Sequence, residues 1–273
     1  MTVKLLAVIA QAETTPACLD AAEAAGHALR DAAIEALHVV VDPGYLITAS
    51  EEVAFQRLRS RHEGTPGERA AATRAAYDAW MVAHPEADIP LRWKERFGAE
   101  EETIQREARI FDVLVLAWPT NLDGGDALHA AMHRIQHPFF LVPSQWRLKP
   151  GARFAGHIVI AWNGTEACRK ALQGALPWLR VAREITLLLI AESRDLAGPA
   201  EDLLNLEQIA CRVQHVPRGS TPLGDQIIAE AHKWNADLLV MGAYRHPQFI
   251  EWLLGGTTRH VLAHFDLPLL LAH

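Results

Sequence analysis

The sequence predicts an α/β protein in which two doubly wound parallel-sheet domains follow one another in tandem. Short apolar segments alternate with longer, alanine-rich or amphipathic segments along the chain of 273 residues, a pattern typical of parallel strands joined by crossover helices. The alternation restarts after residue 156. The predicted domains are residues 1–144 and 157–273, and residues 145–156, which contain Pro150, Gly151 and basic side chains, form the predicted linker.

Two local repeats indicate an internal duplication. The apolar segment that begins at Asp112 recurs at Asp237, at an offset of 125 residues, and the segment around Pro138 recurs around Pro268, at an offset of 130. The second copy therefore carries five more residues between these landmarks than the first. A repeat of this length predicts two copies of one fold.

Ten apolar runs of strand length are predicted to form the sheets. Most are continuous, as expected of strands covered by helices on both faces, whereas the third alternates and fits a sheet edge. In chain order they are Lys4–Ala10, Ile34–Val41, Leu91–Glu95, Asp112–Ala117, Phe139–Val142, His157–Trp162, Ile185–Ala191, Ala210–Val216, Leu238–Met241 and Leu269–Ala272.

Helices are predicted between these strands. The first opens at Thr14–Pro16 and reaches about Leu29, with a proline in the first turn, where its missing N–H has no helical partner to lose. A long segment, Ser50–Ala83, predicts two helices or a helical hairpin and is interpreted as a cover over the first domain's ligand edge, a partner surface or an insertion. The other predicted helices are Ala99–Arg109, Ala127–Ile135, Glu166–Leu176, Ala200–Leu206, Leu223–Trp234 and Thr257–Ala263.

The composition argues against several classes of partner. A net charge of −7 disfavours nucleic acid and anionic membranes. The N-terminal apolar run is too short for a signal sequence, and no run of 18 apolar residues suggests a membrane helix. Cys18, Cys168 and Cys211 form no paired-cysteine motif, which predicts a reducing, cytoplasmic location.

The segment Ala236–His264 carries the strongest functional signal. Its strand, Leu238–Met241, is predicted to stop in a turn at Gly242, and small and hydroxyl residues then stand before an apolar helix. The free N–H groups and the positive dipole end of such a helix suit an anion. The residues at this helix start are Gly255, Gly256, Thr257 and Thr258.

This segment resembles the nucleotide loop of the universal stress protein family, whose pattern is Gly, two residues, Gly, nine residues, Gly, then Ser or Thr. Gly242 and Gly255 match the pattern. Arg245 replaces a glycine, and Gly256 stands where the hydroxyl residue belongs, with Thr257 directly after it. The five additional residues of the second copy fall in this loop, so only the second copy has a recognisable anion site.

Over its whole length the chain resembles a tandem universal stress protein. The resemblance implies two flavodoxin-like domains, of the adenine nucleotide alpha hydrolase-like kind. It also implies that their last strands, Phe139–Val142 and Leu269–Ala272, pair as an internal pseudo-dimer.

The resemblance implies a site for ATP, ADP or AMP in the second domain, beyond the carboxyl ends of the strands. Asn163 takes the place of the aspartate that contacts adenine in the family. Arg245 would bind a phosphate, fill the space that the phosphates need, or stand as an exposed loop residue. The candidate nucleotide-binding residues are Trp162, Asn163, Thr165, Ile190, Gly242, Arg245, Gly255, Gly256, Thr257 and Thr258.

In the first domain the corresponding positions are Gln11 and Ala117–Pro119. They include no glycine turn, so the first domain is predicted to have a degenerate site.

No metal or catalytic residues are predicted. His129, His133 and His137, like His260 and His264, are spaced by four, and two imidazoles one helical turn apart could share a zinc ion. Without an HExxH arrangement or a nearby cysteine, solvated helix faces are the default interpretation. There is no GxSxG, GxxxxGK[ST] or GxGxxG motif, and Cys168 is interpreted as a packing residue.

Three functions follow from these patterns. The first is a stress-response binding or regulatory module with one adenine-nucleotide site in the second domain. The alternative is a structural or protein-interaction stress protein in which both sites have decayed. The third is a slow ATP hydrolase, for which Glu251 is the nearest carboxylate in sequence. The expected partners are an adenine nucleotide, an unidentified protein and further copies of the chain.

Overall fold

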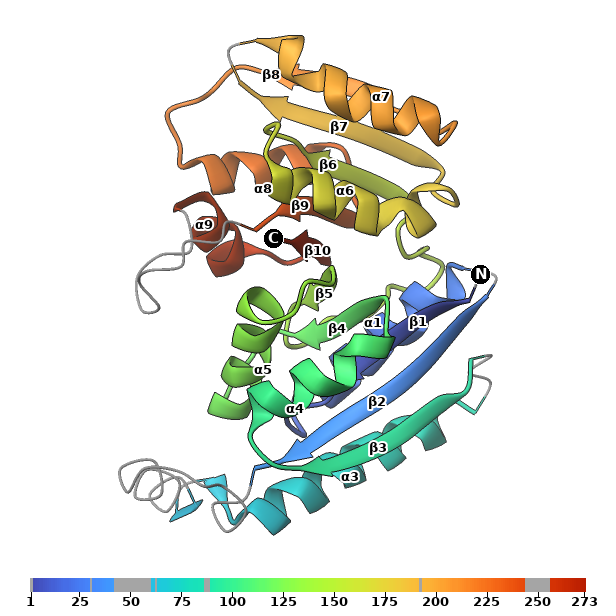
Figure 1. Cartoon of the computed structure of the whole chain (residues 1–273), viewed down its shortest axis with the longest axis vertical. Helices are drawn as coiled ribbons and strands as arrows, with labels where there is room; N and C mark the ends of the chain where they lie inside the picture. Colours follow the sequence, from blue (N-terminus) through green and yellow to red (C-terminus); the bar gives the residue numbers. More distant parts are fainter. Residues whose placement is uncertain are drawn as a thin grey trace. The chain divides into compact units, whose positions relative to one another are not determined.

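The computed structural model describes residues 2–29, 31–41, 60–61, 63–85, 89–191, 193–243 and 256–273. The chain divides into two compact units, each built from strands and helices that alternate along the chain (Figure 1). Unit 1 comprises Met1–His27, Asp31–Ile135 and Ser144–Arg147, and unit 2 comprises Ala28–Arg30, Gln136–Pro143 and Leu148–His273.

Unit 1 contains a parallel sheet in the order β3-β2-β1-β4. The strands are β1 (Val3–Val8), β2 (Ala32–Val40), β3 (Leu91–Phe97) and β4 (Val113–Ala117). The helices are α1 (Thr15–His27), α3 (Pro66–Ala83), α4 (Glu100–Glu107) and α5 (Leu122–His133), and the 3-10 turn η2 (Ala108–Ile110) follows α4.

Unit 2 contains a sheet in the order β5-β10-β9-β6-β7-β8. Its strands are β5 (Phe139–Val142), β6 (His157–Ala161), β7 (Glu184–Ile190), β8 (Arg212–Val216), β9 (Leu238–Gly242) and β10 (Leu269–Ala272). Its helices are α6 (Glu166–Leu179), α7 (Gly198–Leu206), α8 (Leu223–Lys233) and α9 (Gly256–His264), with the 3-10 turn η3 (Arg194–Ala197) before α7.

Strand β5 pairs antiparallel with β10, and the neighbouring pairs from β10 to β8 are parallel. The pairing expected of the two final strands, Phe139–Val142 and Leu269–Ala272, is therefore confirmed.

Right-handed crossovers explain how the helices cover both faces of each sheet. In unit 1 the chain moves from β1 to β2 to β3 in one direction and then returns to β4, so α1 and α3 pack together while α4 and α5 pack together on the opposite face (Figure 1). Unit 2 repeats this arrangement: α8 packs against α9, on the face opposite α6. The order of strands thus reverses between β1 and β4 and again between β6 and β9.

Two helix boundaries differ from the sequence prediction by three residues or more. Helix α5 begins at Leu122 rather than Ala127, because Asn121 caps it by accepting a hydrogen bond from the Gly124 N–H at 3.0 Å, which draws the glycines into the first turn. Helix α6 continues to Leu179 through Pro177 rather than ending at Leu176.

The second part of the Ser50–Ala83 segment is helical, as predicted. Helix α3 starts with a capping box, in which Thr65 accepts from the Glu68 N–H and the Glu68 carboxylate accepts from the Thr65 N–H. Residues 50–59 lie outside the described part of the chain.

The core of unit 2 includes an aromatic cluster that joins β5 to a helix. Phe140 of β5 and Trp178 of α6 are fully buried, with ring centroids 4.7 Å apart in an edge-to-face arrangement. Phe154 also meets Phe140 edge-on, at 5.4 Å. This geometry is the favourable one for aromatic pairs, so β5 contributes to the stability of unit 2 although it precedes the other strands of that unit in the chain.

We expect Phe140→Ala to lower the free energy of unfolding by about 3–5 kcal/mol, because it removes a fully buried ring and its contacts. Urea unfolding of the full-length chain, followed by tryptophan fluorescence and circular dichroism, measures the change. Phe97→Ala is the matched control, because Phe97 on β3 is 56% exposed and should change stability much less. Equal effects of the two substitutions would contradict the assigned role of β5.

Candidate functional site

A pocket lies where the strand order of unit 2 reverses, at the carboxyl ends of β6 and β9. Ala161 of β6 is paired with Met241 of β9, so both strands end at the same edge of the sheet. Ligands of doubly wound folds bind at such a reversal. The pocket encloses about 120 Å³ and is lined by Ala161, Trp162, Asn163, Cys168, Leu188, Ile190, Leu223, Ile227, Met241, Gly242, Thr257 and Thr258.

The structure brings together six of the ten candidate residues identified from the sequence. The six that line the pocket are Trp162, Asn163, Ile190, Gly242, Thr257 and Thr258. Thr165 and Gly256 are described but do not line the pocket: Thr165 caps α6, and Gly256 is the exposed first residue of α9. Arg245 and Gly255, like Glu251, lie outside the described residues.

Asn163 is used in the local structure of the chain. Its Oδ1 accepts hydrogen bonds from the Thr165 backbone N–H at 3.1 Å and from the Thr165 hydroxyl at 2.7 Å, and the Cys168 thiol approaches it at 3.0 Å. This arrangement fixes the turn between β6 and α6, in the manner of an Asx turn. The side-chain oxygen is therefore already satisfied before any ligand arrives.

Trp162 is also held by the protein. The residue is buried, and its indole N–H donates to the carbonyl of Leu196 at 2.8 Å, which ties the end of β6 to η3. The indole thus forms a fixed wall of the pocket rather than a mobile lid.

Gly242 has a different role from the one predicted. It is the last residue of β9 rather than a turn residue, and its φ does not lie in the left-handed region. A Cβ added at this position would lie 2.5 Å from the backbone N of Cys168 and 2.7 Å from the carbonyl carbon of Ala167. Glycine is required because the start of α6 packs directly on the end of β9, and not because of an unusual backbone conformation.

Thr258 supplies the polar group that best indicates a ligand. Thr258 is 1% exposed and lines the pocket, yet its hydroxyl has no hydrogen-bond partner among the described residues. Buried hydroxyls are normally paired. Because Thr258 lies in the first turn of α9, its hydroxyl stands beside the free N–H groups and the positive dipole end of that helix.

The apolar wall of the pocket was missed from the sequence. Leu223 and Ile227 stand one helical turn apart on α8, and Leu188 lies two residues before Ile190 on β7, so both pairs share a face. These spacings are visible in the sequence. They do not reveal which of many apolar faces turns toward the strand ends. Cys168 is buried as predicted and also lines the pocket.

Unit 1 has a hollow at the corresponding edge of its sheet, and its chemistry is different. The hollow measures about 730 Å³ and is bordered by Gln11 after β1, by Thr120 and Asn121 after β4, and by α3. The described part of the Ser50–Ala83 segment thus lines one side of this hollow, and its role as a cover stays a prediction. Four acidic residues line it, namely Glu13, Glu63, Glu68 and Asp123.

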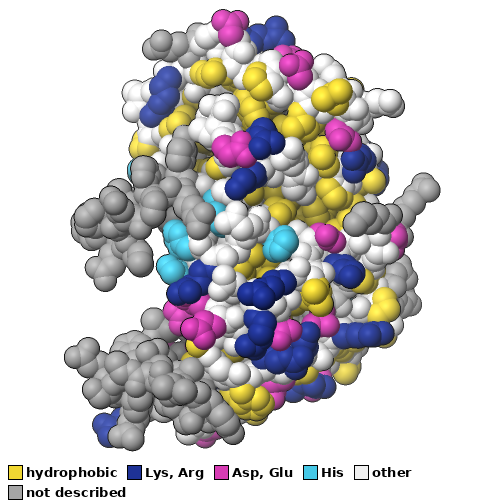
Figure 2. Space-filling view, viewed as in Figure 1, with side chains coloured by type: hydrophobic (Ala, Val, Ile, Leu, Met, Phe, Trp, Pro, Cys, Tyr) yellow, Lys and Arg dark blue, Asp and Glu magenta, His cyan; other side chains and the backbone are white. Residues whose placement is uncertain are grey.

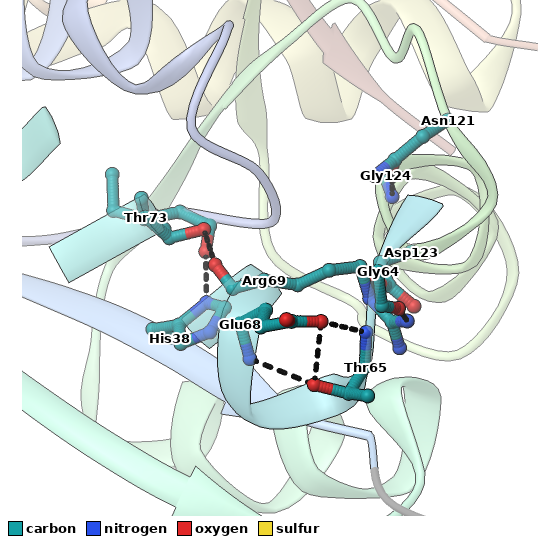
Figure 3. Close-up of polar contacts among 10 residues, drawn as sticks. His38, Gly64, Thr65, Glu68, Arg69, Thr73, Asn121, Asp123 and Gly124 are labelled. Atoms are coloured by element: carbon teal, nitrogen blue, oxygen red, sulfur yellow. Dashed lines mark hydrogen bonds and ion pairs between the residues drawn. The ribbon is translucent and has the colours of Figure 1, made fainter. Parts of the chain in front are cut away.

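Among the described residues of the lining, Arg69 is the one basic residue that faces these acids. Its guanidinium lies 3.7 Å from the buried Asp123, and Figure 3 shows Arg69 extended toward that carboxylate. Hydrogen bonds from the backbone and side chain of Thr65 lower the pKa of Glu68, so this carboxylate is charged at neutral pH. Counted over the described lining residues, four acidic side chains against one basic side chain disfavour a phosphate-bearing ligand in unit 1.

A buried histidine stands beside this hollow. His38 donates from Nδ1 to the Ile9 carbonyl at 2.7 Å, and burial lowers its pKa from the ordinary value of 6.5. The ring is therefore neutral at pH 7 and adds no cation to balance the acidic lining.

No helix among the described residues is long and apolar enough to cross a membrane.

We expect Gly242→Ala to lower the free energy of unfolding by about 1–3 kcal/mol, because the added methyl group meets backbone atoms of α6 that cannot move aside without displacing the helix. Gly256→Ala is the matched control, since a Cβ there meets nothing within 4 Å, and its effect should stay within about 0.5 kcal/mol. Urea unfolding of the two full-length variants tests both statements. Equal stability of the two variants would show that β9 and α6 are not in direct contact.

Comparisons with known proteins agree with the fold. The chain superimposes on a universal stress protein from Archaeoglobus fulgidus with a TM-score of 0.68 and 15% identity, over 98% of this chain and 97% of that one. It also superimposes on a functionally unknown protein from Pseudomonas aeruginosa PAO1 with a TM-score of 0.54 and 13% identity, over 98% and 92% of the two chains. At such identities the likeness concerns the fold alone.

A comparison with curated protein sequences gave no match. A comparison with protein-family models gave a match within unit 2: residues 155–273 match the universal stress protein family.

Proposed function

We propose that unit 2 binds an adenine nucleotide, ATP, ADP or AMP, and that the chain acts as a stress-response binding or regulatory module. The base would enter the pocket between β6 and β9, and the phosphates would lie at the start of α9. The observation that carries the proposal is that Thr258 lines the pocket while its buried hydroxyl has no partner among the described residues.

The lining of the pocket is suited to a flat, uncharged part of a ligand, such as the base of a nucleotide. Ile190, Leu223, Ile227 and Met241 provide apolar contacts, and no charged residue is among the described residues of the lining. At about 120 Å³ the enclosed space lies below the range of about 300 to 1,000 Å³ typical of pockets that bury a whole ligand. It therefore suits one part of a nucleotide, the base, with the remainder outside.

The start of α9 is suited to binding the anionic phosphates of the ligand. The N–H groups of a first helical turn have no intrahelical acceptor, and the helix dipole favours negative charge there. Thr257 and Thr258 add two hydroxyls beside these donors, both on the wall of the pocket. The family pattern expects one hydroxyl residue at the position of Gly256, and these threonines supply it one and two residues later.

The proposal extends to the chain as a whole. Unit 1 is proposed to be a diverged copy of the same domain, in a tandem universal stress protein, because two segments of the sequence repeat and the strand order β3-β2-β1-β4 matches β8-β7-β6-β9. Its acidic hollow has lost the nucleotide site. The cytoplasm is the proposed location, since Cys18, Cys168 and Cys211 are all unpaired.

A second candidate is a structural or protein-interaction role without nucleotide. The observation in its favour is that Asn163, which replaces the adenine-contacting aspartate, already gives its side-chain oxygen to Thr165 and Cys168. The side-chain oxygen of Asn163 is thus already occupied and is not left for the edge of a base.

Thr258→Val tests the proposed function. Valine keeps the shape of threonine and removes the hydroxyl, so we expect ATP affinity to fall about tenfold or more, as for a hydrogen bond to a charged group. The free energy of unfolding should stay the same or rise, because the substitution also removes a buried hydroxyl that has no partner among the described residues. Isothermal titration with ATP, ADP and AMP, together with urea unfolding, measures the two effects.

Thr186→Val is the control for this substitution. Thr186 is equally buried, but its hydroxyl is 2.9 Å from His157 Nε2 and lies outside the pocket. Its loss should lower stability by about 1 kcal/mol and leave ATP affinity unchanged. The unmodified protein is also titrated with millimolar nucleotide. If it shows neither binding heat nor a rise in melting temperature, the chain does not bind the nucleotide, because a ligand far above its Kd must stabilise the fold.

The second candidate makes the opposite prediction. It expects no binding to the unmodified protein and a gain of binding in Arg245→Gly, which restores the glycine of the family pattern and opens the space beside it. The same titrations measure this gain, and Arg245→Lys, which keeps a cation of similar length, is the control. Tight binding by the unmodified protein would dismiss the second candidate.

A further inference from the structure

Three potential metal ligands meet between α8 and α9 in unit 2. His260 and His264 lie one turn apart on α9, and Asp225 lies in the first turn of α8. One nitrogen or oxygen atom from each residue falls within 4.8 Å of the other two. Asp225 Oδ1 is 3.1 Å from His264 Nδ1, and Asp225 Oδ2 is 4.0 Å from His260 Nδ1.

A glycine contact between the two helices holds these residues together. A Cβ added to Gly224 would lie 2.6 Å from the Cβ of His260, 2.6 Å from the carbonyl oxygen of Thr257 and 2.8 Å from the backbone N of Val261. The backbone of α8 therefore touches α9 one residue before Asp225. The fully buried Val261 holds α9 at the same contact. The backbone positions of Asp225, His260 and His264 are therefore fixed relative to one another.

The shared carboxylate favours a metal over a set of ion pairs. Asp225 carries one negative charge and faces two histidines. To pair with both as ions, the histidines would both have to be protonated, at the cost of repulsion between two neighbouring cations. Without an ion, His264 Nδ1 lies 3.2 Å from the His260 carbonyl oxygen, to which it donates. One dication bound by the carboxylate and by one nitrogen of each imidazole satisfies all three groups without placing two cations side by side.

We infer that unit 2 binds a divalent transition-metal ion of the zinc type on Asp225, His260 and His264. Two imidazoles and a carboxylate are a set that Zn²⁺ accepts, with a fourth position left for water. Calcium and magnesium prefer sites made of oxygen atoms. The three residues are between one-third and two-thirds exposed, so an ion from solvent can reach them. Histidine side chains are also exposed on the face of the chain drawn in Figure 2.

In unit 1 the helices α4 and α5 correspond to α8 and α9, and they also carry histidines and a carboxylate. His129 and His133 stand one turn apart on α5, with ring centroids 4.6 Å apart, and His129 Nδ1 lies 2.7 Å from Glu101 of α4. The other oxygen of Glu101 is 2.5 Å from the guanidinium of Arg134. A fixed cation on the carboxylate repels a dication, so only the cluster of unit 2 is inferred to bind metal.

The test is a titration of ZnCl₂ into the full-length chain, stripped with chelator, without nucleotide, by isothermal calorimetry. We expect one strong equivalent, no comparable heat with MgCl₂, and a rise in the melting temperature on adding Zn²⁺. Asp225→Asn and His264→Ala should each weaken Zn²⁺ binding at least about tenfold, since even outer partners of a metal site carry that effect. His264 is 60% exposed, so its replacement should leave the fold intact.

Two further variants identify the site among the 14 histidines of the chain. His133→Ala in unit 1 and His232→Ala, on the same helix as Asp225 but paired with Asp266, should bind Zn²⁺ as the unmodified protein does. Cobalt(II) gives an independent signal, because coordination by imidazole in a four-coordinate site produces visible absorption bands that His264→Ala should abolish. Unchanged Zn²⁺ affinity in His264→Ala, or no strong equivalent in the unmodified protein, would overturn the inference.

Discussion

The reversal of strand order between β6 and β9 is the constraint on which the architecture of unit 2 depends. Right-handed crossovers place α6 on one face of the sheet and α8 and α9 on the other, so no crossover passes over the strand ends where the order reverses. Glycine at two positions determines how closely the helices approach this edge. Gly242 lets α6 lie on the end of β9, and Gly224 lets α8 lie on α9. The pocket is the space that remains between these contacts.

The two units differ in charge more than in shape. The hollow of unit 1 is larger, about 730 Å³ against about 120 Å³, and size alone would favour it as the ligand site. In the part of each lining that the structure describes, however, acids outnumber the one arginine in unit 1, whereas unit 2 has no charged residue next to its helix start. For an anionic ligand, the electrostatic difference outweighs the difference in volume.

Much of the fold could be predicted because most strands are local, continuous apolar runs such as Leu238–Met241. The threonines after Gly256 could be predicted because a helix start is also local. The role of Gly242 could not, since a glycine in a turn and a glycine under a helix look alike in sequence. Likewise, the histidines of α9 are visible at a spacing of four, but Asp225 lies 35 residues before His260 and meets it only through the packing of two helices. Contacts of this kind depend on the tertiary structure and leave no periodic signal.

Helix α9 connects the two sites that we propose. It has nine residues, and an isolated helix of that length is marginal in water, so its order depends on burial of Val261 and Leu262 and on its contact with Gly224. The helix dipole is favourable to anions at the first turn and to cations at the last. The proposed phosphates lie beside Thr257 and Thr258, and the inferred metal ion is bound by His264, the last residue of the helix. Each ligand thus meets the end of α9 that matches its charge, and each would stabilise the same short element that forms one wall of the pocket.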